Sequence, residues 1–291
     1  MDALLIILTA SFIAIPNGLL GNFLILRKMS MIGDAISHAV LPGIVIGFLF
    51  SGSIHSLPIL IGAASFGLLT TLIIETFYQK GKLQKDASIG VAFTTMFALG
   101  VILVSLFAEN VDIDTECVLN GEIGYVALET PLFYIGDLGI PITTMEVFFL
   151  SIIVIAFVII GFKGLLITSF DEAFAKSIGV STNFWNYLLM SLVSIVTVLS
   201  FESVGAILVV ALMIAPASSA YLVTKKLKVM IVLSILFGIT GSVFGYYLAN
   251  YFNTSISAGI VVVLGGIFSI CFIFATQRKP KISYEGSEYQ K

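Results

Sequence analysis

The stretch VMIVLSILFGITGSVFGYYLA, residues 229–249, carries no charged side chain. A helix rises about 1.5 Å per residue, so a segment of this length crosses the roughly 30 Å hydrocarbon core of a bilayer. The whole chain of 291 residues is 58% hydrophobic and 11% charged, which is far more apolar than a soluble domain needs. The sequence therefore predicts an all-α, polytopic transmembrane helical bundle.

Further apolar segments set the number of crossings. The nine predicted spans are residues 3–26, 32–50, 58–78, 87–107, 146–167, 185–201, 203–223, 229–249 and 256–275. The segment 185–201 is at the lower length limit for a crossing. We favour nine spans, and the alternative is eight, with 185–223 forming one broken or re-entrant element.

The basic residues predict how the bundle is oriented. With nine crossings, all 14 Lys and Arg residues fall on one side of the membrane. By the positive-inside rule that side is the cytoplasm, so we expect the N-terminus outside and the C-terminus inside. We expect a single transmembrane domain over residues 1–278 and a polar cytoplasmic tail over residues 279–291.

The longest hydrophilic stretch, from Glu109 to Glu146, contains eight acidic residues and no basic residue. The predicted topology places it outside the membrane. An acidic loop can raise the local concentration of cations near an entrance, but we favour a plain solvated loop. Cys117 within it offers a soft metal ligand, although a single thiol is weak evidence for a site.

An acid and an imidazole, Asp34 and His38, lie inside the second predicted span. A charged side chain at that depth costs roughly 2.5–3.5 kcal/mol on insertion scales. Residues four apart share one helix face, so both groups can contact one small cation. Pro42 interrupts the helix, and broken helices at membrane depth commonly line cavities. The structural alternative is a polar pair bonded to neighbouring helices, with Ser37 satisfying a backbone carbonyl.

The oxygen and nitrogen donors of Asp34 and His38 suit Mn, Fe or Zn, or a proton. Two ligands do not complete a coordination shell, so water, backbone carbonyls or a second copy of the chain must contribute. Incomplete ligation suits an ion that has to leave again. We therefore expect a transient site rather than a closed structural zinc site.

Three other positions are weaker pathway candidates: Glu202, Ser203 and Pro216. With nine spans, Glu202 and Ser203 lie near the outer surface, whereas in a re-entrant segment they line the path. Pro216 is expected to kink its helix and free a carbonyl near mid-membrane, or to serve packing only. Glu75 lies near the cytoplasmic end of its span, and we expect its side chain to reach water.

The cytoplasmic stretch 169–180 is predicted to form a short helix, with acidic residues early, a lysine later and Gly179 as its C-terminal cap. Phe174 and Ile178 lie four residues apart, on one face that suits a partner groove. The alternative is a helix that packs against its own bundle.

Several enzyme motifs are missing from the sequence. It contains no phosphate-binding loop, no His-Glu-x-x-His and no recognisable Ser/His/Asp set. We therefore expect a chain that is not an enzyme and does not hydrolyse nucleotide itself. The net charge of −3 is small, and we expect no nucleic-acid partner.

Residues 29–43, MSMIGDAISHAVLPG, closely resemble the signature of the ABC-3 family, the membrane permeases of bacterial manganese, zinc and iron ABC importers. Three further stretches are similar to the family: LITSFDEAFA at 166–175 and on to Gly179, SVGAILVVALMIAPA at 203–217, and CVLNGEI at 117–123. The last is typical of the manganese/iron branch. The resemblance runs over roughly residues 10–275.

The resemblance implies a type II ABC importer-like permease in the bacterial cell membrane. Its implied partners are a second copy of itself, two copies of an ABC ATP-binding subunit, and an extracellular or periplasmic metal-binding protein. Asp34 and His38 correspond to the metal-contacting pair of the family, and the segment 169–179 corresponds to the region that couples to the ATPase. The residues given this coupling role are Ser169, Phe170, Asp171, Glu172, Ala173, Phe174 and Gly179. Glu202 departs from the uncharged polar residue that we expect in related permeases, so metal preference is not carried over.

The combined prediction is the channel-forming half of an ATP-driven importer for Mn(II), with Zn(II) or Fe(II) as other cargoes. The chain binds no permanent cofactor, its partner uses the ATP, and Asp34 and His38 form the metal site and gate. The alternative is an ion-coupled secondary metal transporter in which this pair relays protons. A third hypothesis is a structural or assembly membrane protein with a buried polar pair.

Overall fold

The computed structural model describes residues 2–51, 57–107, 122–135 and 138–277, without the side chains of Ile135, Leu138 and Glu202. Within these ranges, nine helical segments are long and apolar enough to span a membrane. The prediction of nine spans is confirmed. The stretch 185–223 forms two separate helices instead of one re-entrant element.

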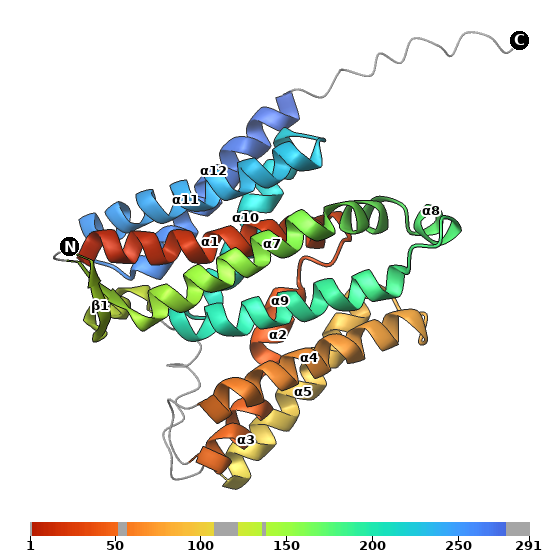
Figure 1. Ribbon diagram of the computed structural model, residues 1–291, viewed down its shortest axis with the longest axis horizontal. Helices are drawn as coiled ribbons and strands as arrows, with labels where there is room; N and C mark the ends of the chain where they lie inside the picture. The colour runs from red at the N-terminus through yellow and green to blue at the C-terminus, as the bar shows by residue number, and fades with distance from the viewer. Residues whose placement is uncertain (1, 52–56, 108–121, 136–137, 278–291) are drawn as a thin grey trace, which may run out of the picture.

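Within the described residues, the elements follow one another as nine spans, and some of the connections contain short elements of their own (Figure 1). The spans are α1 (Asp2–Leu26), α2 with α3 (Ile32–Ala39 and Leu41–Ser51), α4 (Leu57–Gln79), α5 (Lys85–Phe107), α7 (Ile142–Phe170), α9 (Thr182–Val204), α10 (Ala206–Val223), α11 (Leu227–Phe252) and α12 (Ile256–Gln277). The connections contain the 3-10 turn η1 (Ile123–Leu128), the strands β1 (Pro131–Ile135) and β2 (Leu138–Pro141), and the short helix α8 (Glu172–Ser177).

The bundle is built around α1 and α9 (Figure 1). α1 contacts α7, α10 and α11, while α9 contacts α2, α4 and α7. α3 packs against α4 and α5, and α12 packs against α10 and α11. Large apolar side chains such as Ile160 of α7 and Phe272 of α12 are exposed on the outer faces, as expected for a surface that lies against lipid.

Small residues allow the backbones to approach closely at several contacts in the bundle, including those of α1 with α10 and of α3 with α4. A Cβ atom on Gly21 of α1 would lie 1.9 Å from the carbonyl oxygen of Met213 in α10. A Cβ atom on Gly43 of α3 would lie 2.2 Å from the carbonyl oxygen of Gly62 in α4. Such glycine contacts are the usual way for membrane helices to gain packing energy.

The Lys and Arg residues of the described ranges gather toward one end of the bundle, because successive spans alternate in direction. We call the end that carries α8 and the α4–α5 turn the basic end. The opposite end carries the N-terminus of α1 and the β1–β2 pair, and we call it the hairpin end (Figure 1). At the hairpin end Gly205 alone joins α9 to α10, with φ 81° and ψ 162°, a backbone region open essentially only to glycine.

The predicted hydrophilic loop is partly structured at the hairpin end. β1 and β2 pair antiparallel, with Phe133 opposite Ile140 and Tyr134 opposite Gly139. Before them, η1 packs against α1 and α12 and buries Ile123. The residues of the loop from 108 to 121, including Cys117, and His55 of an earlier loop lie outside the described residues.

Two acids of this loop cap helices instead of remaining free in water. The carboxylate of Glu122 accepts hydrogen bonds from the backbone N–H groups of Ile256 and Ser257 at the start of α12, at 3.0 and 3.2 Å. The carboxylate of Glu129 accepts a 2.6 Å hydrogen bond from the hydroxyl of Thr143 in the first turn of α7. The expectation of a plain solvated loop is therefore wrong for these two residues, since negative charge at a helix N-terminus satisfies free N–H groups and the dipole.

Candidate functional site

The second span is interrupted next to Pro42. α2 ends at Ala39 and α3 begins at Leu41. Pro42 has no N–H group to donate to the carbonyl of His38, which lies one helical turn earlier. The predicted break in this helix is confirmed, and it comes directly after the residues of interest.

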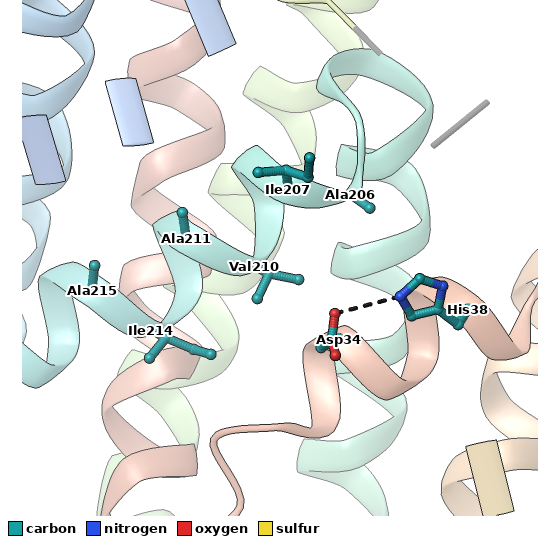
Figure 2. Close-up of a pocket in the computed structure, with 8 residues that line it drawn as sticks. All are labelled: Asp34, His38, Ala206, Ile207, Val210, Ala211, Ile214 and Ala215. Atoms are coloured by element: carbon teal, nitrogen blue, oxygen red, sulfur yellow. Dashed lines mark ion pairs between the residues drawn. The ribbon is translucent and has the colours of Figure 1, made fainter. Parts of the chain in front are cut away.

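The short helix α2 presents its polar residues on one side. Ile36 is fully buried in the core, whereas Asp34 and His38 point toward α10 (Figure 2). The hydroxyl of Ser37 donates a 2.8 Å hydrogen bond to the carbonyl of Gly33. This serine is therefore satisfied within its own helix, as expected, and competes for neither member of the pair.

Asp34 and His38 face a cavity of about 520 Å³ between α2 and α10 (Figure 2). The rest of its lining is apolar and comes from Ala206, Ile207, Val210, Ala211, Ile214 and Ala215. Asp34 Oδ1 lies 3.7 Å from His38 Nε2, which is longer than a hydrogen bond. Their side chains are 41% and 34% exposed in the single chain. Both groups therefore retain lone pairs for a further partner at an otherwise apolar cavity that is partly open.

Among the described residues, Asp34 and His38 are the only His, Cys, Asp or Glu side chains that line this cavity. In the described part of the chain, no group of three or more His, Cys, Asp or Glu residues is placed to hold a metal ion. The ring of His38 also packs edge-on against Phe97 of α5, with 5.8 Å between the ring centres. Packing of this kind restricts the imidazole and leaves Asp34 as its polar neighbour.

The other pathway candidates are not among the described residues that line the cavity. Ser203, in the last turn of α9, donates a 3.2 Å hydrogen bond to the carbonyl of Leu199. Pro216 is buried in α10, which continues through it, and its neighbour Ala215 does line the cavity. The side chain of Glu202 lies outside the described residues. The apolar wall formed by α10 escaped the sequence reasoning, although its alanines stand in the stretch 203–217 that resembles the family.

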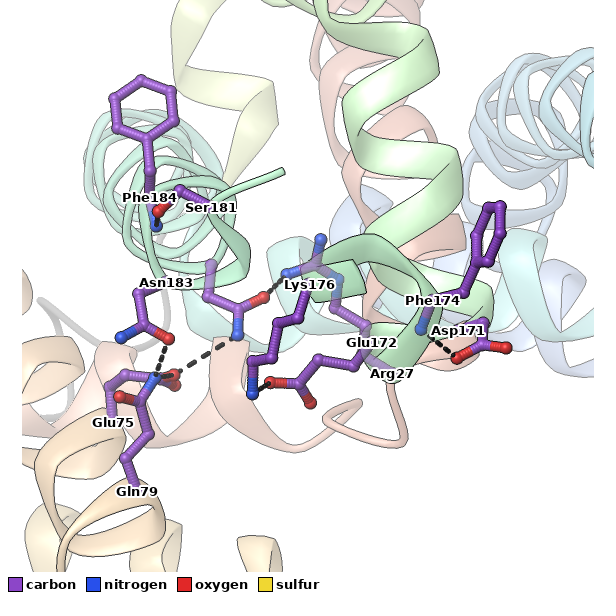
Figure 3. A network of polar contacts seen from close by, with 11 residues as sticks. Arg27, Glu75, Gln79, Asp171, Glu172, Phe174, Lys176, Ser181, Asn183 and Phe184 are labelled. Carbon is purple, nitrogen blue, oxygen red and sulfur yellow. Dashed lines mark hydrogen bonds and ion pairs between the residues drawn. The ribbon is translucent and has the colours of Figure 1, made fainter. Parts of the chain in front are cut away.

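The predicted cytoplasmic helix is present as α8. The carboxylate of Asp171 accepts a 2.8 Å hydrogen bond from the N–H of Phe174 and so caps its start (Figure 3). Gly179 has φ 81°, and the N–H of the next residue bonds to the carbonyl of Ala175 at 2.9 Å, which is the expected glycine cap. An ion pair of 3.0 Å joins Lys176 to Glu172 along the helix.

One side of α8 packs inward and the other is open. Ala175 is fully buried against the bundle, while Phe174 is 53% and Ile178 50% exposed. Phe170, just before the helix, is also exposed. The inward face thus packs against the chain's own bundle, while the docking of a partner on the open face stays a prediction.

Glu75 does not reach water, contrary to our expectation. It is 1% exposed, and its carboxylate accepts hydrogen bonds from Gln79 and, at 3.4 Å, from Asn186 of α9. The prediction failed because the partners that enclose this carboxylate include a helix more than one hundred residues away in sequence.

Comparison with known proteins identifies the family of this chain. The model of the ABC 3 transport family matches residues 3–275. The chain belongs to the ABC 3 transport family. The resemblance found in the four sequence stretches is confirmed, and so is the predicted fold of an ABC transporter permease.

This ABC 3 chain is 41% identical over 272 residues to the manganese transport system membrane protein MntD of Bacillus subtilis (strain 168), across 93% of this chain and 91% of that protein. It is 38% identical to the zinc transport system membrane protein TroD of Treponema pallidum (strain Nichols), across 93% and 73%. Its fold matches PsaBC from Streptococcus pneumoniae in complex with Fab, with a TM-score of 0.74 and 38% identity over 92% and 90% of the two chains.

Proposed function

We propose that this ABC 3 chain is the membrane permease of an ATP-driven importer for a divalent transition metal, with Mn(II) as its main cargo. The observation that carries the proposal is the pair Asp34 and His38, set on a broken helix against an otherwise apolar cavity. A carboxylate and an imidazole are suitable ligands for Mn(II), Zn(II) and Fe(II). Relatives named for manganese and zinc transport support this choice of cargo.

The cargo ion binds at Asp34 and His38 and then leaves. Two donors per chain give weak ligation, which permits release. A second copy of the chain, related by a two-fold axis beside α2 and α10, doubles the donors to four. This arrangement also removes two partly exposed polar groups from lipid, where they are costly. The open face of the pair therefore supports a homodimer.

Energy enters at the basic end. Two copies of an ABC ATP-binding subunit dock on the segment 169–179, whose exposed Phe170, Phe174 and Ile178 fit an apolar groove. Closure of these subunits switches which side of the pathway is open. ATP is used by these partners, and this chain holds no permanent cofactor.

The topology follows from charge. The basic end faces the cytoplasm of a bacterial cell, which puts the N-terminus outside and the C-terminus inside. Residues 1–278 then form one transmembrane domain, and residues 279–291 form a cytoplasmic tail. A metal-binding protein delivers the ion at the hairpin end. The pathway roles of Glu202, Ser203 and Pro216 stay predictions.

The test is metal uptake by vesicles that contain the chain together with its ATP-binding subunit. ATP-driven uptake of radioactive Mn(II), Zn(II) and Fe(II) is measured for wild type, Asp34→Asn and His38→Gln. We expect each substitution to lower uptake by at least about tenfold, the scale on which metal sites respond to altered ligation. Asp86→Asn, at the exposed start of α5, is the matched control and should transport as wild type does.

Two results contradict the proposal. Wild-type uptake in both site variants would leave Asp34 and His38 as a structural polar pair. Metal uptake by the chain alone, driven by a proton gradient without ATP, would establish a secondary transporter instead.

A further inference from the structure

A buried arginine joins three helices at the basic end. Arg27 directly follows α1 and is only 6% exposed. At the end of α7, its Nε donates a 3.0 Å hydrogen bond to the hydroxyl of Ser169, and its Nη2 donates a 2.9 Å hydrogen bond to the hydroxyl of Thr168. Its Nη1 donates to the side-chain oxygen of Asn186 in α9. One planar guanidinium therefore fixes the end of α7 and the start of α9 relative to α1.

Asn186 connects this arginine to a buried acid. Its oxygen accepts from Arg27, and its Nδ2 donates a 3.4 Å hydrogen bond to the carboxylate of Glu75 in α4. The amide thus lies between opposite charges with both of its ends correctly oriented. Burial lowers the pKa of Arg27 to about 10, a shift that the negative charges of Glu75 and Glu172 oppose, so the guanidinium stays charged at neutral pH. We call Arg27, Glu75, Thr168, Ser169 and Asn186 the Arg27 cluster.

The backbone of Arg27 is held as firmly as its side chain. Its carbonyl accepts a 2.8 Å hydrogen bond from Lys85 Nζ at the start of α5. The N–H groups of Lys28 and Met29 bond to the carbonyls of Ile25 and Leu24 at 3.0 and 2.9 Å. With Lys28 at φ 57°, this is the pairing of a Schellman cap, which ends α1 in one defined geometry.

Only residues 28–31 separate this cap from α2, and Asp34 is the third residue of α2. Met29 and Ile32 are buried in the core, so the connection has few ways to absorb a displacement. Arg27 therefore contacts Ser169, the first residue of the coupling segment. It also lies only a short distance along the chain before the metal pair.

Open space lies beside the cluster. A cavity of about 240 Å³ is lined by members of the cluster together with Lys85 and Glu172, the first residue of α8. Figure 3 shows Arg27, Glu75 and Glu172 of this lining. The bonded cluster therefore has space beside it into which it can shift as a unit without unpacking the bundle. A fully packed site would not offer that freedom.

We infer that the Arg27 cluster is the junction that transmits movement of the coupling segment 169–179 to the linker 28–31 and so to the metal helix α2. In this role Arg27 is a positioning residue that touches no cargo. The inference rests on the proposed function, because it needs a metal pathway at α2 and an ATPase at α8. Loss of the junction should separate ATP hydrolysis from metal movement.

The test compares ATP hydrolysed with Mn(II) transported by the reconstituted complex of permease and ATP-binding subunit. Arg27→Lys keeps the charge but loses the planar fork that reaches three acceptors at once. Asn186→Ala keeps the guanidinium and removes its link to Glu75. Asn183→Ala is the matched control, because Asn183 is an exposed amide one turn earlier on α9 whose side-chain oxygen accepts a 3.3 Å hydrogen bond from Gln79. We expect Mn(II) moved per ATP to fall at least about fivefold in the first two variants and to stay unchanged in the control.

The ratio separates coupling from folding. A variant that merely assembles poorly loses hydrolysis and transport by the same factor, so an unchanged ratio in both cluster variants overturns the inference. If Arg27→Lys does not assemble, the ratio for Asn186→Ala decides alone. Wild-type complex that hydrolyses ATP without moving metal would refute the proposed function, whereas normal coupling in wild type and in both cluster variants refutes only the junction.

Discussion

The two polar regions of this membrane protein differ in how completely their hydrogen bonds are satisfied. Asp34 and His38 lie 3.7 Å apart and face a cavity whose other lining is apolar. Arg27 and Glu75 are almost fully buried, and both engage side chains of other helices. A polar group that is left open can accept a mobile ion, whereas one that is fully bonded holds helices in place. Both regions thus combine a carboxylate with a basic side chain, but only the region around Arg27 and Glu75 has these groups enclosed by partners from other helices.

The strongest test of this contrast is thermal stability after removing one charge from each region. Arg27→Met should lower the free energy of unfolding by about 3–5 kcal/mol, because it leaves the carboxylate of Glu75 buried without its compensating charge. Asp34→Asn should change stability by only about 0.5 kcal/mol, since that side chain is partly exposed and keeps its size. Melting of the purified chain in detergent measures both. Equal losses in the two variants would remove the distinction.

A smaller effect is expected where α1 packs against α10, which lines the cavity beside Asp34. Gly21→Ala places a methyl group against the backbone carbonyl of Met213 in α10, and overpacking of this kind costs about 1–3 kcal/mol. Mn(II) uptake should fall as well, because α10 lines the cavity. Gly90→Ala in α5 is the control, since no atom lies within 4 Å of the added carbon apart from its chain neighbours and the backbone of its own helix. If Gly21→Ala transports and melts as Gly90→Ala does, α1 does not set the position of α10.

The smallest effect concerns the linker between the two regions. Lys28 adopts φ 57°, a left-handed conformation that costs a non-glycine residue roughly 1–2 kcal/mol. Lys28→Gly relieves this strain but adds freedom to the unfolded chain, so a net gain of about 0.5 kcal/mol is expected. The melting temperature measures it, and a loss of stability would show that the lysine side chain contributes more than the strain removes.

The parts of the fold that depend on local sequence were predictable. Apolar length set the nine spans, and the four-residue spacing placed Asp34 and His38 on one face of α2. Asp171 caps the start of α8, and Gly179 follows its end in the left-handed conformation, as expected for a helix predicted over this stretch. Each of these features is decided within a few turns of helix.

The predictions that failed concern features that depend on residues distant in the sequence. Glu75 stands near the end of its helix, where a long acidic side chain normally finds water, yet Asn186 of α9 encloses it. Glu122 lies in a loop of the sequence, but in the folded chain its carboxylate accepts a hydrogen bond from Ile256 at the start of α12, 134 residues away. The apolar wall of the cavity likewise comes from α10, and nothing in the spacing around Asp34 specifies that neighbour.

Gly205 gives the bundle a mechanical property. A connection one residue long has little slack, so the last residue of α9 and the first residue of α10 stay two peptide units apart, within about 7 Å of each other. The far end of α9 carries Asn186, and α10 carries the cavity wall. The two helices therefore share one hinge, at Gly205. We expect a tilt of α9 at the basic end to change the angle between α9 and α10, and with it the width of the cavity beside Asp34.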